Sequence, residues 1–171
     1  MMGLSLPEKQ RLFCLAGEIG ADVPVCLFPG YQIMQGDGTD VRPAKIKEGH
    51  LHCALANPGN PILTATIFSA LHPKNYSSKL ISFPKQDAIQ LKDILALGND
   101  LYEPAIGISP QIATLISRME NSSVANRLLG VGMSGSGATC FALSTSQDIV
   151  RQLCEELNAF GFWAVATSLI K

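Results

Sequence analysis

GVGMSGSGATCFAL, residues 130–143, joins a loop rich in glycine and serine to a run of β-branched and aromatic residues. Four glycines and two serines in residues 130–138 let the backbone approach a ligand closely and supply amide and hydroxyl donors, which suit a phosphate group. The loop is not a Walker loop, because no lysine follows Gly137. Its first three glycines match the spacing of the dinucleotide fingerprint, but that fingerprint leads into a helix, whereas residues 139–143 predict a strand. The segment therefore predicts a strand, a phosphate-side loop and a second strand. The alternative is a glycine hairpin without a ligand, which the density of glycine and serine disfavours.

The segments around this loop alternate between strand and helix patterns. Short apolar runs predict strands, and apolar residues at helical spacing predict helices. This pattern is typical of an α+β fold with helices on one face of an antiparallel sheet. The strands are expected at 51–56, 128–131, 139–143 and 163–169, and the helices at 63–71, 87–97, 110–119 and 146–160.

The first part of the chain has a different organisation. A helix is expected to begin after Ser5, a suitable cap, and to end at Gly20. Two short strands should follow, at 25–28 and 31–35, and a polar stretch then links this part to the rest. We place a domain boundary there, which divides the chain into residues 1–46 and 47–171.

Composition excludes several classes of function. Of 171 residues, 47% are hydrophobic and 16% are charged, which favours a folded chain over a disordered one. Thirteen basic and fourteen acidic residues leave a net charge of -1, so we expect no nucleic-acid partner. The absence of a signal-peptide pattern and of a membrane-length apolar run predicts a cytoplasmic chain without a membrane partner.

The cysteine and histidine patterns do not predict a metal site. The five cysteines are widely spaced in apolar stretches and form no Cys-x-x-Cys pair, so we expect buried, reduced thiols. His50 and His52 alternate on a predicted strand without a third ligand, so we assign no metal to them.

A second candidate for chemistry is the sequence GADVP at residues 20–24. Asp22 lies there on a corner made rigid by Pro24, between apolar neighbours. Partial burial would favour a role as a general base or in orienting a hydroxyl. Taken alone, an aspartate that follows a helix is more often a turn or cap residue than a catalyst.

These segments resemble the motifs of one enzyme family when they are taken in order. GADVP, the glycine turn at 36–38, the Pro58-Gly59 pair followed by Thr64, and SGSGA at 134–138 cover nearly the whole chain. The chain resembles the GHMP family of small-molecule kinases. Within it, the GADVP context is similar to the branch that acts on 4-diphosphocytidyl-2-C-methyl-D-erythritol in non-mevalonate isoprenoid biosynthesis.

The resemblance implies ATP-dependent phosphorylation of the 2-hydroxyl of that substrate, with ATP and Mg²⁺ as cofactors. Asp22 would be the catalytic residue that accepts or orients the hydroxyl proton, and Thr64 would bind the substrate. The implied fold is a ferredoxin-like carboxyl-terminal domain preceded by the end of the amino-terminal kinase lobe. The residues implied beside the transferred phosphate are Gly132, Ser134, Gly135, Ser136 and Gly137.

The chain also departs from the family pattern. Residues 36–39 read GDGT where the family often has an acidic fourth residue, so no acidic role is carried to that corner. The amino-terminal half of the family, with its lysine and its glycine-rich ATP loop, has no counterpart here. We therefore expect the isolated chain to be inactive and to associate with itself through the apolar side chains of residues 1–46, which are Leu12, Leu15, Ile19, Val25, Leu27 and Ile33.

Two alternatives remain open. The first is a non-catalytic ferredoxin-like module that binds a small molecule or a protein partner. The second is another GHMP kinase, which would act on homoserine or on a mevalonate-type alcohol.

Overall fold

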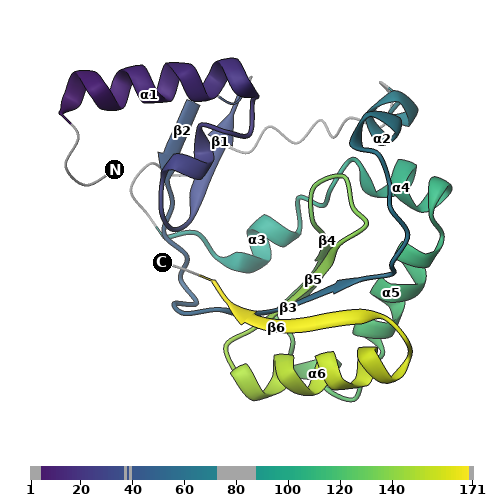
Figure 1. The fold of residues 1–171 in the computed structure, drawn as a ribbon. Coiled ribbons are helices and arrows are strands. Elements are labelled where there is room, and N and C mark those ends of the chain that lie inside the picture. The colour runs from purple at the N-terminus through teal and green to yellow at the C-terminus, as the bar shows by residue number, and fades with distance from the viewer. Residues whose placement is uncertain (1–4, 37, 39, 73–87, 170–171) are drawn as a thin grey trace.

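The main body of the protein is a four-stranded antiparallel sheet in the strand order β4-β5-β3-β6 (Figure 1). The computed structural model describes residues 5–36, 38, 40–72 and 88–169. From β3 onward the elements follow a β-α-β-β-α-β plan with the first strand in the interior of the sheet, as in ferredoxin-like folds. The α+β prediction is confirmed. The strands are β3 (His52–Asn57), β4 (Gly130–Met133), β5 (Cys140–Ser144) and β6 (Trp163–Ser168).

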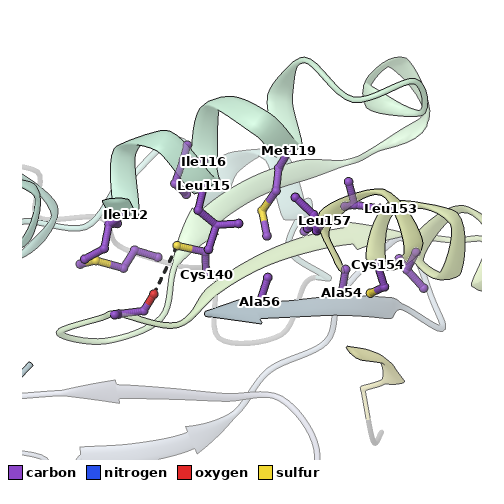
Figure 2. Close-up of a cluster of buried hydrophobic side chains, with 14 of the residues drawn as sticks. Ala54, Ala56, Ile112, Leu115, Ile116, Met119, Cys140, Leu153, Cys154 and Leu157 are labelled. Atoms are coloured by element: carbon purple, nitrogen blue, oxygen red, sulfur yellow. Dashed lines mark hydrogen bonds between the residues drawn. The ribbon is translucent and has the colours of Figure 1, made fainter. Parts of the chain in front are cut away.

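Helices α5 (Gln111–Glu120) and α6 (Gln147–Ala159) cover one face of this sheet and bury the larger core (Figure 2). Ala54 and Ala56 alternate along β3 with Cys53 and Leu55, which face the other side of the sheet, and the small alanine side chains leave room for the helices to pack closely. The sheet side of α6 is an apolar stripe with helical spacing, formed by Ile149, Val150, Leu153, Cys154 and Leu157.

Between β3 and α5, the described residues contain three shorter helices, α2 (Thr64–Ala70), α3 (Leu91–Leu95) and α4 (Tyr102–Ile108). The predicted helix at 87–97 is observed only as α3, and its first residue lies outside the described residues. Helix α4 had not been expected, because Pro104 and Gly107 weaken its helical pattern. Pro104 lies in the first turn of the helix, where its missing N–H leaves no hydrogen bond unmade.

Part of the opposite face of the sheet is also buried, whereas Trp163 and Val165 of β6 are exposed there. Cys53 and Leu143 project from the sheet and pack with Leu51 and Leu91, and Tyr31 and Ile46 lie against this second cluster. The amino-terminal elements accordingly lie on the side of the sheet away from α6 (Figure 1).

The amino-terminal part contains α1 (Leu6–Ile19) and a hairpin of β1 (Gln32–Gln35) and β2 (Asp40–Pro43). Ser5 and Glu8 form a capping box, in which the Ser5 amide and hydroxyl donate to the Glu8 carboxylate at 2.8 and 2.6 Å. The predicted strand at 25–28 is wrong. Val25–Leu27 form a 3₁₀ turn, because Pro24 takes a helical conformation and local bonds such as Phe28 N to Val25 O close the turn.

Hydrogen bonds fasten the segment that joins the two predicted domains. The Ile89 amide donates to Lys45 O at 2.8 Å, and the Lys47 amide donates to Ile89 O at 3.0 Å. The Glu48 carboxylate accepts the Leu91 amide at 3.0 and 3.1 Å. The boundary at residue 46 stays a prediction, but the chain on either side of it is held to the segment that leads into α3.

The cysteines separate into two groups. Cys53, Cys140 and Cys154, hereafter the buried thiols, lie in the two cores, and burial raises their pKa values to about 11, 12 and 11. Cys14 and Cys26 are exposed, so the expectation that all five are buried was wrong. Helix α1 buries only Ala16, which leaves Cys14 without a covering element. Among the described residues, the helices are too short or too polar to span a bilayer.

Candidate active site

The glycine loop, residues 132–137, lies at the turn between β4 and β5. Its backbone closes on itself, because the Ser134 amide donates to Thr139 O and the Gly137 amide donates to Ser134 O, both at 2.9 Å. Gly137 has a φ of +83°, and a Cβ added there would lie 2.8 Å from Met133 Sδ. The turn therefore needs glycine at this position on both conformational and steric grounds.

Side chains from three other segments hold the loop. The Thr64 and Ser136 hydroxyls are hydrogen-bonded at 2.9 Å, although they are 72 residues apart in sequence. Asn57, at the end of β3, donates to Thr139 Oγ1 at 3.0 Å, while its own oxygen accepts the Gly59 amide at 2.8 Å. The end of β3, the start of α2 and the glycine loop thus form one site.

Asn99 supports the loop from the other side. Its Nδ2 group donates to Met133 O at 3.1 Å and to Gly135 O at 2.8 Å. Its Oδ1 atom accepts the Leu101 amide at 2.9 Å, just before α4. The contact of Asn99 with the loop was not predicted from the sequence.

Two cavities border the loop, and they differ in charge. The smaller, about 510 Å³, is lined by the Asn57–Ile62 turn region together with Gly137 and Ala138, and no charged residue lines it. The larger, about 890 Å³, is lined by Asp100, Glu103 and Glu120 and contains no basic residue. Burial raises the pKa of Tyr102 in the larger cavity, and the nearby Cys140, Glu120 and Glu103 raise it further. An anionic ligand is therefore better suited to the smaller cavity.

Asp22 lies on the corner that follows α1. Its side chain is exposed, so the partial burial expected from its apolar neighbours is not observed. A Cβ on Gly38 would lie 2.9 Å from the main-chain carbonyl carbon of Ala21, so the predicted glycine turn lies directly against this corner. The structure thus groups the predicted site residues in two places, Thr64 with the loop and Asp22 with Gly38. No hydrogen bond between described residues joins the two places.

The residues present fit the phosphate part of ATP or of a diphosphate better than they fit a metal. The loop offers amide and hydroxyl groups, and its Gly137 lines the smaller cavity, which has no charged residue in its lining. Within the described residues, no group of three or more His, Cys, Asp or Glu side chains could hold a metal ion. The loop can therefore contribute phosphate contacts.

Residues 80–162 match the family described as GHMP kinases C terminal. The chain carries a GHMP kinase carboxyl-terminal domain. This GHMP domain begins in the connection before α3 and ends at the start of β6, so it contains the glycine loop and Asn99.

Curated relatives match the GHMP domain together with the amino-terminal part. The 4-diphosphocytidyl-2-C-methyl-D-erythritol kinase of Granulibacter bethesdensis is 37% identical over 96% of this chain and 55% of its own length. The enzyme of the same name from Gluconacetobacter diazotrophicus is 34% identical over 98% of the chain and 53% of its own length. The chain thus spans about half the length of the curated relatives it matches.

Solved structures agree with this assignment. A crystal structure of 4-(cytidine 5'-diphospho)-2C-methyl-D-erythritol kinase matches 94% of this chain and 57% of its own chain, with a TM-score of 0.71 and 27% identity. Homoserine kinase from Cytophaga hutchinsonii matches 86% of this chain with a TM-score of 0.50 and 20% identity, which shows a shared fold alone.

Proposed function

We propose that this chain supplies the acceptor side of a kinase site that transfers a phosphoryl group from ATP to the 2-hydroxyl of 4-diphosphocytidyl-2-C-methyl-D-erythritol. The observation that carries the proposal is the hydrogen bond between Thr64 and Ser136. It joins the predicted substrate residue to the predicted phosphate loop across 72 residues of sequence. The substrate is that of the related kinases to which the chain is similar.

In this proposal the loop binds and orients phosphate oxygens through amide and hydroxyl donors, whose dipoles are fixed before the ligand arrives. Thr64 fixes the position of the Ser136 hydroxyl beside the substrate. Asp22 accepts or orients the proton of the attacking hydroxyl, and its exposed carboxylate is accessible to a ligand. Bound Mg²⁺ would supply charge neutralisation of the phosphates. The chain by itself is proposed to be inactive, because phosphoryl transfer requires more phosphate contacts than this loop offers.

A thermal-shift series on the purified chain tests the substrate assignment. Ligand binding to the folded state raises the melting temperature, and the rise grows with the ratio of ligand concentration to Kd. We expect a rise with the diphosphocytidyl substrate and a smaller one with cytidine diphosphate. We expect none with homoserine, and Thr64→Val should reduce the rise with the substrate.

Two outcomes would contradict the proposal. A rise with homoserine alone would favour another GHMP activity. A rise with amino acids and none with phosphate-bearing ligands would favour a regulatory binding module. Thr66→Val, on the same exposed helix but without a hydrogen bond to the loop among the described residues, is the matched control.

We also propose that the chain associates with a second copy through α1. Leu6, Leu15 and Ile19 are 71%, 46% and 77% exposed, which is unusual for three large apolar side chains on one helix. The other predicted contact residues, Leu12, Val25, Leu27 and Ile33, are partly buried within the amino-terminal part instead. Light scattering after size-exclusion chromatography should show a dimer that Ile19→Lys disrupts and Glu18→Lys, an adjacent exposed change, does not. A monomeric wild-type chain would refute this interface.

A further inference from the structure

Contacts from outside the glycine loop set the direction in which its amide donors point. The loop has little internal support, because between described residues its backbone makes only two hydrogen bonds beyond the pairing of β4 with β5, from Ser134 and from Gly137. Glycine-rich backbone has many accessible conformations, so a loop of this kind needs external contacts to hold one of them. Thr64 and Asn57 reach only side-chain oxygens of the loop region.

Asn99 differs from these two because it bonds to the loop backbone. Its carboxamide donates to the carbonyl oxygens of Met133 and Gly135, which lie on either side of Ser134. One rigid planar group therefore fixes two peptide planes. Its oxygen is in turn held by the Leu101 amide, so the loop is tied to the start of α4.

The geometry of a peptide bond turns this contact into a directional effect. Across a trans peptide, the C=O of one residue and the N–H of the next point in opposite directions. The bond between Gly135 and Ser136 is trans, so an oxygen of Gly135 that faces Asn99 directs the Ser136 N–H away from Asn99. Among the described residues, no acceptor is bonded to that N–H.

We infer that Asn99 is a positioning residue that holds the Gly135–Ser136 peptide with the Ser136 N–H turned outward as a donor for a phosphate oxygen. This inference rests on the proposed phosphate role of the loop and adds the residue that fixes its geometry. When the Thr64 hydroxyl donates to Ser136 Oγ, the Ser136 hydroxyl and the Ser136 amide form a pair of donors from one residue.

Asn99→Asp separates this role from helix capping. Aspartate keeps an oxygen that can accept the Leu101 amide, but it has no N–H to donate to Met133 O and Gly135 O. Asn158 provides a matched control, because its Nδ2 donates to Ala164 O and its Oδ1 accepts the Ala164 amide, both at 3.0 Å, between α6 and β6. Asn99→Ala, which removes both the cap and the loop contact, is the second variant.

The experiment uses the ¹⁵N-labelled 171-residue chain, with amide hydrogen exchange measured first and pyrophosphate titration second. Loss of two hydrogen bonds should speed exchange of the Ser134 and Gly137 amides about tenfold in Asn99→Asp. Exchange in β3 should stay within about twofold of wild type, which shows that the variant is folded. Asn158→Asp should leave the loop unchanged.

In the titration, the Ser136 amide resonance should shift with pyrophosphate in the wild type, and Asn99→Asp should weaken the affinity about fivefold or more. Unchanged loop exchange in Asn99→Asp would overturn the positioning role, whether or not the loop binds phosphate. Faster exchange with unchanged pyrophosphate affinity would overturn the assigned orientation of Ser136. In a last outcome, the wild-type chain does not bind pyrophosphate, but the loop amides exchange faster in Asn99→Asp than in the wild type. That outcome would refute the phosphate role and leave Asn99 as the support of the loop.

Discussion

Replacing Gly137 with alanine tests whether the glycine loop is fixed by sterics as well as by backbone conformation. At a φ of +83°, an alanine costs about 1–2 kcal/mol relative to glycine. The new Cβ would also lie 2.8 Å from Met133 Sδ and 3.3 Å from Ile112 Cδ1. Overpacking costs about 1–3 kcal/mol, and the flexible methionine should keep it near 1–2 kcal/mol. The variant should therefore lose about 2–4 kcal/mol of unfolding free energy.

Gly135→Ala isolates the conformational part of this cost. Gly135 has a φ of +55° but no neighbour within 4 Å of an added Cβ, so this variant should lose only about 1–2 kcal/mol. For a chain of this size 1 kcal/mol shifts Tm by about 2–4 °C, so Gly137→Ala should melt roughly 4–16 °C lower. Urea and thermal unfolding followed by circular dichroism measure both variants. Equal losses for the two would refute the steric account of the loop.

Three further outcomes follow from contacts described above. A double-mutant cycle of Thr64→Val and Ser136→Ala should give a coupling energy of about 0.5 kcal/mol in urea unfolding, because the hydrogen bond between the two side chains is exposed. If the losses of unfolding free energy in the two single variants add up to the loss in the double variant, the hydrogen bond adds no stability. The buried thiols have pKa values raised from 9.0 to about 11, 12 and 11, so the folded chain holds protons that the unfolded chain loses above pH 9. Their contribution to stability should be complete below pH 9 and lost as the pH rises toward 11 and 12, and a flat urea midpoint over that range would contradict it. A thiol reagent at neutral pH should modify Cys14 and Cys26 quickly and the buried thiols only on unfolding; quick modification of all five would show that the cores are open.

The sequence predicted the sheet and its helices well where local patterns and packing agree. The run before Asn57 became β3, and the β-branched and aromatic run after the glycine loop became β5. The prediction failed at Val25, whose β propensity was overridden because Pro24 had already set a helical turn.

The candidate site was predictable only in part. The glycine loop and Thr64 could be named from their motifs, and the structure brings them into contact. The backbone contacts of Asn99 could not be predicted, because they depend on how the segment between α3 and α4 is placed beside the loop. The exposure of Asp22 depends on which elements cover the corner after α1, and apolar neighbours in sequence do not determine that.

The hydrogen bonds around Glu48 have a consequence for how the proposed site could work. Kinase lobes that close around a substrate need a few residues whose backbone angles are free to change. Here the Glu48 carboxylate holds the Leu91 amide, Lys45 and Lys47 are bonded to Ile89, and Ile46 packs in the second core. This junction is therefore not built as a hinge. The corner that carries Asp22 and the sheet that carries the glycine loop should move as one body, so any closure over the substrate must come from side chains or from segments outside this junction.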